Sequence, residues 1–210
     1  MWEVWLSLAT VFLSCVAIVI NIYQNRETKK QNLFDRRLRL YLEFMDMWNL
    51  YKNNIFFLDK LNPMSIDVVF SYITNSANFY MLADIMPEPL DNTKKITFLT
   101  ACENLKKDAK EFRFVFDEKY IKCANFIEAY VNMIQQFHRQ QIIIKSYDKQ
   151  SEEKLARGLN PLEYDYVEKE CTKFAKAENG LFSSIQDIKN IYEEIKKNKL
   201  LEKLEKEIKF

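Results

Sequence analysis

The chain begins with an apolar run that carries no charge over residues 4–25. A helix of ~22 residues is about 33 Å long and matches the ~30 Å hydrocarbon core of a bilayer. Trp2 and Trp5 stand at one end of the run and Tyr23 at the other, where membrane interfaces favour aromatic rings. The pattern predicts a transmembrane anchor over residues 1–25, in contact with the lipid bilayer.

A stripe of small and polar residues interrupts this run at steps of three and four, which places its members on one helix face: Ser7, Thr10, Ser14, Ala17 and Asn21. Small residues let two helices approach closely, and hydroxyl or amide groups can bond across the contact. We therefore expect a transmembrane oligomer seam. Two alternatives stay open: the hydroxyls can bond their own helix's carbonyls, and the stripe can line water.

Cations follow the run and none precedes it: Arg26, Lys29, Lys30, Arg36, Arg37 and Arg39. The positive-inside rule then predicts a short N-terminus outside and residues 26–210 in the cytoplasm, as a single-pass protein of the inner (cytoplasmic) membrane. The same cations can contact anionic headgroups. The start, MWEVW, has no early cation, and no small-x-small cleavage pattern follows. We therefore expect a retained anchor rather than a cleaved signal peptide.

The next segment predicts a helix from about residue 27 to residue 59. It has no flexible linker before it, so we expect it to continue the transmembrane helix as one rod, bent near Asn25. Apolar residues at helical spacing predict its buried stripe: Phe34, Leu38, Tyr41, Met45 and Trp48, widened by Leu33, Phe44 and Leu58. The helix should stop at Pro63.

Two further helical regions precede a predicted loop. The segment SIDVVFSYITNSANFYMLADIM predicts one helix over residues 65–86, capped by Ser65 or Asn62 and ended by two prolines. Residues 93–147 are helical in pattern but too long for one typical helix, so an interruption is expected near FVFDEKY. The segment SEEKLARGLNPLEY predicts a loop, because it holds Gly158 and Pro161.

A last helical region is expected from about residue 162 to the end, weakened at Asn179 and Gly180. Its apolar residues keep a rhythm of three and four through Ile195 and resume out of phase at Leu201. Barely two heptads precede this slip, so the pattern favours an amphipathic helix packed on its own bundle. A short intermolecular coiled coil is the alternative.

The composition supports an all-α fold: an N-terminal transmembrane helix followed by a cytoplasmic helical bundle. The 210 residues include only 2 Gly and 4 Pro, too few for the frequent turns of a sheet protein. The net charge is +1, so nucleic-acid binding is not evident. The wide spacing of Cys15, Cys102, Cys123 and Cys171 predicts free thiols in a reducing compartment.

Catalytic and cofactor signals are sparse. His138 is the single histidine, and no glycine-rich phosphate loop or nucleophile elbow occurs. We therefore expect no metal, no cofactor and no enzymatic activity. Two interpretations of His138 stay open: a helix-surface or buried polar residue, and a base acting with one of the cysteines.

The phrases LFDRRLRLYLEFMDM and FRFVFDEKYIKCANFIEAY carry a resemblance. After an N-terminal span, they resemble uncharacterised bacterial single-span membrane proteins with a small cytoplasmic α-helical body. No activity follows from that resemblance. In layout alone, the chain is also similar to membrane-anchored accessory proteins of antiviral systems, some of which assemble pores.

Three functional hypotheses follow. The first is a membrane-anchored interaction protein that forms a homo-oligomer through its transmembrane helix and works with a cytoplasmic protein partner. The second is an oligomeric pore-forming or membrane-disrupting effector of a bacterial antiviral defence system. The third is an enzyme with an unrecognised site.

Overall fold

The computed structural model describes residues 2–62, 65–159 and 164–208. Within these ranges every regular element is helical, which confirms the all-α prediction: α1 (Trp2–Asp59), α2 (Ile66–Ile73), α3 (Tyr80–Ala83), α4 (Asn92–Val115), the 3-10 turn η2 (Glu118–Tyr120), α5 (Ile121–Ala156), α6 (Tyr164–Lys197) and α7 (Leu200–Ile208). Pro63 and Pro161, which the sequence pattern uses as helix breakers, lie outside the described residues.

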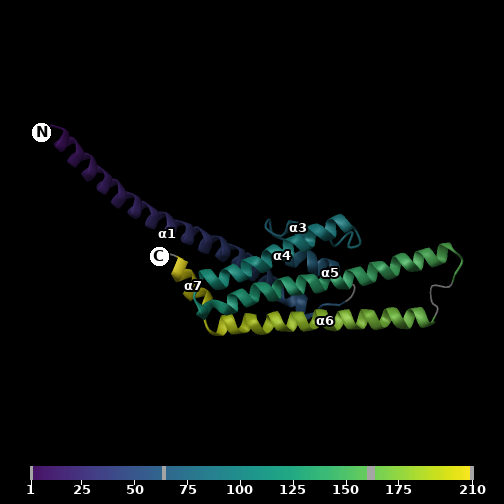
Figure 1. The fold of residues 1–210 in the computed structure, drawn as a ribbon. Helices are drawn as coiled ribbons and strands as arrows, with labels where there is room; N and C mark the ends of the chain where they lie inside the picture. Colours follow the sequence, from purple (N-terminus) through teal and green to yellow (C-terminus); the bar gives the residue numbers. More distant parts are fainter. Residues whose placement is uncertain (1, 63–64, 160–163, 209–210) are drawn as a thin grey trace.

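Helix α1 is one unbroken helix of 58 residues. The sequence has neither glycine nor proline before Pro63, so nothing in it opens the backbone hydrogen-bond ladder. The expected continuation of the apolar run into the next segment is confirmed, and the helix passes through residues 25 and 26 without a break. Figure 1 shows it as a gently curved rod whose second half joins the other helices.

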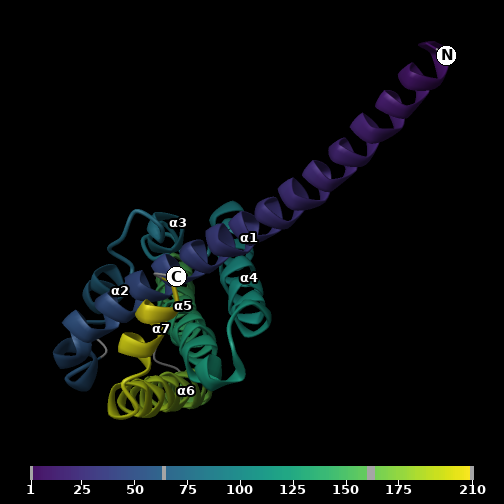
Figure 2. The ribbon, with the colours of Figure 1, turned by 90° about the vertical axis from the view of Figure 1, so that its left-hand side faces the viewer.

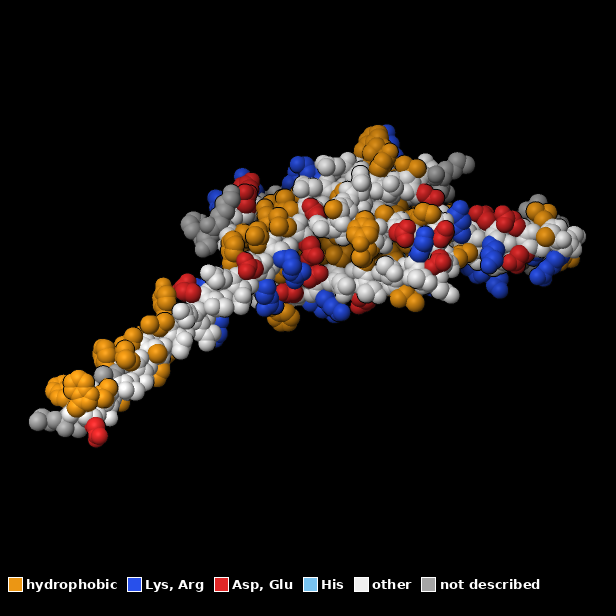
Figure 3. All heavy atoms as spheres, turned by 90° about the horizontal axis from the view of Figure 1, so that it is seen from above, with side chains coloured by type: hydrophobic (Ala, Val, Ile, Leu, Met, Phe, Trp, Pro, Cys, Tyr) orange, Lys and Arg blue, Asp and Glu red, His pale blue; other side chains and the backbone are white. Residues whose placement is uncertain are grey.

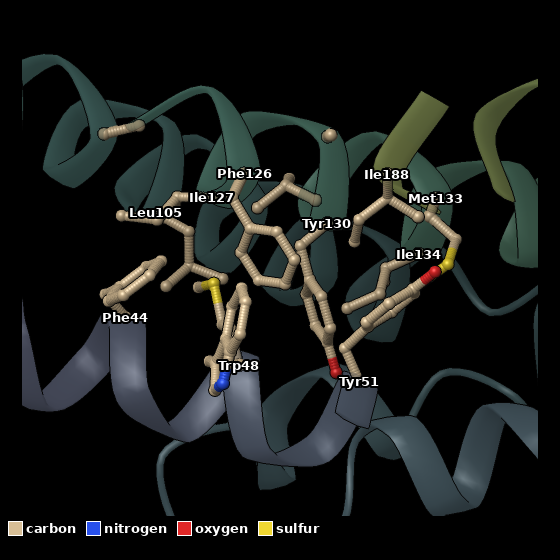
Figure 4. Close-up of a cluster of buried hydrophobic side chains, with 14 of the residues drawn as sticks. Phe44, Trp48, Tyr51, Leu105, Phe126, Ile127, Tyr130, Met133, Ile134 and Ile188 are labelled. Carbon is tan, nitrogen blue, oxygen red and sulfur yellow. The ribbon is translucent and has the colours of Figure 1, made fainter. Parts of the chain in front are cut away.

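Helix α5 is the centre of the body, packed against α4 on one side and α6 on another. Its buried side chains meet those of α1 in an aromatic cluster (Figure 4). The Phe126 ring centroid lies 5.8 Å from that of Phe44 and 5.4 Å from that of Trp48, and Trp48 stacks on Tyr192 of α6 at 4.4 Å. Ring pairs at these separations add stabilisation beyond their buried area.

The predicted buried stripe of α1 is confirmed in part: Phe44, Trp48 and Leu58 are buried, and Leu38, Tyr41 and Met45 are partly buried at the edge of the core. Leu33 and Phe34 are exposed, and the fully buried positions are Leu40, Phe44, Met47 and Tyr51. These follow the same three-four spacing, so the buried face of the helix is turned relative to the predicted stripe and shares Phe44 with it. The body contacts α1 only from about Arg36 onward, which leaves the two earlier residues without packing partners.

The predicted helix over residues 65–86 is wrong in its continuity, because α2 ends at Ile73 and α3 begins at Tyr80. Ser76 and Asn78 lie between them and both donate hydrogen bonds to the Asp46 carboxylate of α1. Short polar side chains of this kind favour turns over helix interiors. Ser65, one of the two predicted caps, is the N-cap residue of α2, but its side chain makes no capping hydrogen bond to that helix. It pairs with Asn62 instead: Ser65 N–H donates to Asn62 Oδ1 at 3.1 Å, and Asn62 N–H donates to Ser65 Oγ at 3.2 Å.

The interruption near FVFDEKY is confirmed, since α4 ends at Val115 and α5 begins at Ile121. The loop prediction is wrong for its first half, because α5 continues to Ala156. Gly158, with φ 68°, then ends the helix in a Schellman motif. In this motif Gly158 N–H donates to Leu155 O at 3.0 Å, and Leu159 N–H donates to Lys154 O at 2.9 Å.

Helix α6 runs through Asn179 and Gly180, so the weak point expected there does not interrupt the helix. A Cβ on Gly180 would lie 3.1 Å from Gln136 Oε1, which shows how closely α6 packs on α5 there. The chain instead turns at Lys199, with φ 51°, and continues as α7. This turn explains why the apolar pattern changes phase between α6 and α7. Ile195 and Leu200 are both buried, although they are five residues apart in the chain and a continuous helix would not place them on one face.

Candidate functional site

The N-terminal half of α1 projects away from the other helices (Figure 2). Every described side chain between residues 5 and 26 is exposed. Among the described residues, α1 is the one helix that is long and apolar enough to cross a membrane, and none of its apolar window is buried. Figure 3 shows apolar side chains along this segment and charges gathered over the body.

The stripe residues lie on this exposed segment, and two of its hydroxyls are bonded within the helix. Thr10 Oγ1 donates to Leu6 O at 2.9 Å, and Ser14 Oγ donates to Thr10 O at 2.8 Å. Such bonds satisfy a hydroxyl without a partner helix or water. Thr10 and Ser14 therefore present a small, internally satisfied surface, while Asn21 is exposed at the end nearer the body.

The aromatic residues Trp2, Trp5 and Tyr23 are all exposed on the same projecting segment. They lie toward its two ends and make no core contacts. Their amphipathic rings are of the kind found at membrane–water interfaces.

The structure divides the predicted basic cluster into two groups. Arg36, Arg37 and Arg39 reach α4: Arg36 Nε donates to Glu111 Oε1 at 2.7 Å, and Arg37 Nε donates to Val115 O at 3.1 Å. Arg39 donates to both Asp108 and Glu111 at 2.8 Å. These three arginines hold the body against α1, a contact that sequence spacing alone does not reveal.

The second group lies closer to the apolar segment. Lys30 pairs with Glu27 at 2.8 Å, one turn before it on the same exposed helix surface. Arg26 and Lys29 are exposed as well. Within the described residues, Arg26, Lys29 and Lys30 make no hydrogen bond or ion pair to the body, unlike the three arginines.

Glu43 shares the arginine contact and is a titratable group that the sequence did not single out. Burial raises the pKa of its carboxyl to about 7, and the nearby Asp108 adds to this, while Arg39 at 3.5 Å opposes it. The hydrogen bond from Arg36 lowers the pKa of Glu111 beside it. The α1–α4 contact thus holds one carboxyl that is easily protonated and one that is not.

His138 is buried between α4 and α5. Its ring centroid lies 4.5 Å from that of Phe98, and Nε2 has no hydrogen-bond partner among the described residues. Burial lowers the pKa of the imidazole, and a hydrogen bond to the Pro89 backbone opposes this. The geometry matches the buried polar interpretation of this residue and gives the imidazole no open surface.

All four cysteines lie within the described residues and are free thiols. Cys102 and Cys123 are buried, and burial raises the pKa of each thiol to about 12, so they stay protonated at neutral pH. A protonated, buried thiol is a poor nucleophile. Cys15 and Cys171 are exposed, the former on the projecting part of α1.

An apolar groove of about 390 Å³ lies between α5 and α6, at the end of the body opposite the projecting segment. Its apolar lining includes Ile143, Ile144, Tyr147, Val167, Cys171 and Phe174. Glu170, also in the lining, is paired with Lys173 at 2.5 Å. The sequence did not predict this groove, because it exists only where α5 and α6 pack against each other.

Comparisons with protein family models, with curated proteins and with solved structures found no match for this chain. The resemblance to bacterial single-span membrane proteins therefore stays a prediction.

Proposed function

We propose that this chain is a membrane-anchored helical interaction protein that self-associates through its transmembrane segment. The observation that supports this most is the exposure of the apolar half of α1, none of whose apolar window is buried in the body. Exposed apolar surface on this scale marks a membrane or protein contact. Its length and its flanking aromatic rings favour the bilayer.

The same helix supports a retained anchor rather than a removable leader. The apolar segment and the packed segment are parts of one uninterrupted α1, so cleavage between them would cut a helix whose far half holds Phe44 and Trp48 in the core. Arg26, Lys29 and Lys30 follow the apolar segment, and the positive-inside rule then places the body in the cytoplasm.

The stripe is proposed as a dry contact between helices rather than the lining of a pore. Thr10 and Ser14 bond to carbonyls of their own helix, so neither hydroxyl requires water. Small side chains on one face then allow close packing with a second copy.

Disulfide crosslinking tests the seam, and the chain supplies its own control. Ser14 belongs to the stripe, whereas the neighbouring Cys15 is turned by ~100° around the helix. With Cys171→Ser in both proteins, Ser14→Cys with Cys15→Ser is compared with native Cys15 in membranes under mild oxidation. We expect covalent dimer from position 14 and at least ~10-fold less from position 15.

Equal crosslinking from the two positions would sink the proposed seam, because random collision has no preferred face. Dye release from liposomes holding the unmodified protein separates the pore alternative. Tight liposomes support a dry contact, and leakage that grows with protein concentration supports a pore.

A further inference from the structure

His138 is a buried titratable group with one nitrogen bonded and the other left without a partner. The residue is 5% exposed, and Nε2 makes no hydrogen bond within the described part of the chain. The imidazole is bonded to the Pro89 backbone, and proline has no N–H, so the ring donates to the carbonyl oxygen. Because Nε2 is unpartnered, the donor is Nδ1, and the neutral ring carries its proton there.

The segment bonded to His138 is short and irregular. We call residues 87–91, between α3 and α4, the strap. Pro89 is its one buried residue, and the other four are exposed. The remaining neighbours of His138 are α4 and α5, two long helices packed against each other. An irregular segment with few buried side chains opens at a lower cost than packed helices, so the strap is the part that can move.

The charges around His138 do not favour a proton on it. Lys95 of α4 acts on the imidazole and opposes protonation. In the strap, Glu88 pairs with Lys94 at 3.1 Å, and Asp91 accepts a hydrogen bond from the Lys94 N–H at 2.8 Å. Both carboxylates are therefore held by Lys94. The neighbours of His138 one turn away on α5 are uncharged, at residues 134, 135, 141 and 142.

A second proton on the ring changes the balance at Nε2. This atom would become a buried N–H donor with no acceptor, which is costly. The bond to Pro89 would become charge-assisted, which favours protonation. Burial and Lys95 outweigh that bond, so the pKa of His138 lies below its ordinary value of 6.5. Acid therefore favours any movement that brings Nε2 into water.

We propose that His138 and the strap form an acid-operated device: the strap is closed over the neutral imidazole and opens when the ring takes a second proton. Two surface hollows share Pro87 in their linings, one of about 460 Å³ between the strap and α5 and one of about 640 Å³ between α3 and α4. Movement of the strap changes the shape of both. The device lies in the body and works with or without a membrane.

The size of the effect follows from the ordinary pKa. With the strap open, His138 titrates near 6.5, so the ratio of open to closed molecules rises as the pH falls below that value. At about pH 5.5, one unit lower, the rise is at most ~10-fold. Glu43 acts in the opposite direction, because it gains a proton over this range and the α1–α4 contact is then stabilised. Opening of the strap is therefore distinct from loss of the whole fold.

Hydrogen exchange of the full-length protein in detergent tests the device, at about pH 7.5 and about pH 5.5, after correction for the intrinsic exchange rate. We expect residues 84–95 to lose ~5-fold in protection at the lower pH while α6 keeps its own. His138→Asn is the control, because its amide N–H replaces Nδ1 and takes no proton. The loss should vanish in this variant. Unchanged protection in the unsubstituted chain, or the same loss in both proteins, would overturn the inference.

A second measurement follows the imidazole itself. His138 is the single histidine, so its ring signals in proton NMR are unambiguous, and we expect a titration midpoint below 6.5. Lys95→Gln removes the opposing charge and should raise the midpoint and reduce the loss of protection. Lys95 is exposed, so this variant tests the device even where His138→Asn unfolds the chain. A midpoint at or above 6.5, or equal loss of protection along α4, α5 and α6, would contradict it.

Discussion

At the scale of single residues, Glu43 links the charge of the α1–α4 contact to folding. Its carboxyl ordinarily titrates at 4.5, and burial raises its pKa to about 7 in the folded chain. The groups that face it are Arg39 and Asp46 of its own helix and Asp108 and Glu111 of α4. Between these two pH values the folded state holds a proton on Glu43 that the unfolded state has lost.

Stability should therefore fall as the pH rises from about 4.5 to about 7, because the native state binds more protons across that window. Glu43→Gln keeps the size of the side chain and removes the charge. We expect it to flatten this pH dependence and to raise the free energy of unfolding at about pH 8 by ~2 kcal/mol. Urea unfolding in detergent at about pH 5 and about pH 8 measures both effects.

The control is Glu103→Gln, an exposed carboxyl on α4, which should leave the pH dependence as it is in the unsubstituted chain. The same slope in the Glu43 and Glu103 variants would show that burial of Glu43 does not set the pH dependence.

At the scale of elements, the ends of helices are decided by single backbone positions. Gly158 has φ 68°, and nothing lies within 4 Å of where a Cβ would be. Glycine is therefore favoured there by the backbone conformation and not by a lack of room for a side chain. Gly158→Ala should cost ~1 kcal/mol, since an L-residue in the left-handed region costs ~1–2 kcal/mol and alanine restricts the unfolded chain slightly.

Gly180→Ala is the matched control for this substitution. Gly180 is inside α6, where alanine is favoured over glycine by ~0.5–1 kcal/mol, and its one near contact is the flexible end of Gln136. We expect its unfolding free energy to be unchanged or slightly raised. If the two alanine variants lose equal stability in urea unfolding, the helix end is not set by the backbone of Gly158.

Much of the element order follows from local sequence. The lack of a flexible linker after the apolar run predicts the long α1, and the interruption near FVFDEKY is predicted because residues 93–147 are too long for one typical helix. The turn after Ile73 is not predicted by local sequence, because it is stabilised by the Asp46 carboxylate from another helix. The close approach of α6 to α5 at Gly180 is likewise a tertiary contact that local sequence does not show.

The candidate site, too, could be predicted from the sequence only in part. The apolar segment, its stripe and its flanking aromatics are read directly from residues 1–25. The role of Arg36 and Arg39 could not be predicted from the sequence. Their partners Asp108 and Glu111 are about 70 residues away in the chain and meet them only in the fold. A cation near a membrane segment therefore predicts topology, but not whether a tertiary contact already holds it.

At the scale of the whole molecule, the chain is a helical rod with a body fixed along one side of its second half (Figure 2). The 58 residues of α1 extend over ~87 Å, and about 33 Å of this belongs to the apolar run. No break separates the two parts of this helix.

Alkaline carbonate extraction of membranes from expressing cells tests whether the apolar half of α1 crosses a membrane. The matched variant carries Leu13→Arg and Val16→Arg, each of which costs ~3 kcal/mol near the centre of a span. We predict that the unsubstituted chain stays in the membrane pellet and that the double variant moves to the supernatant. Release of the unsubstituted chain by carbonate would show that this half of α1 does not span the membrane.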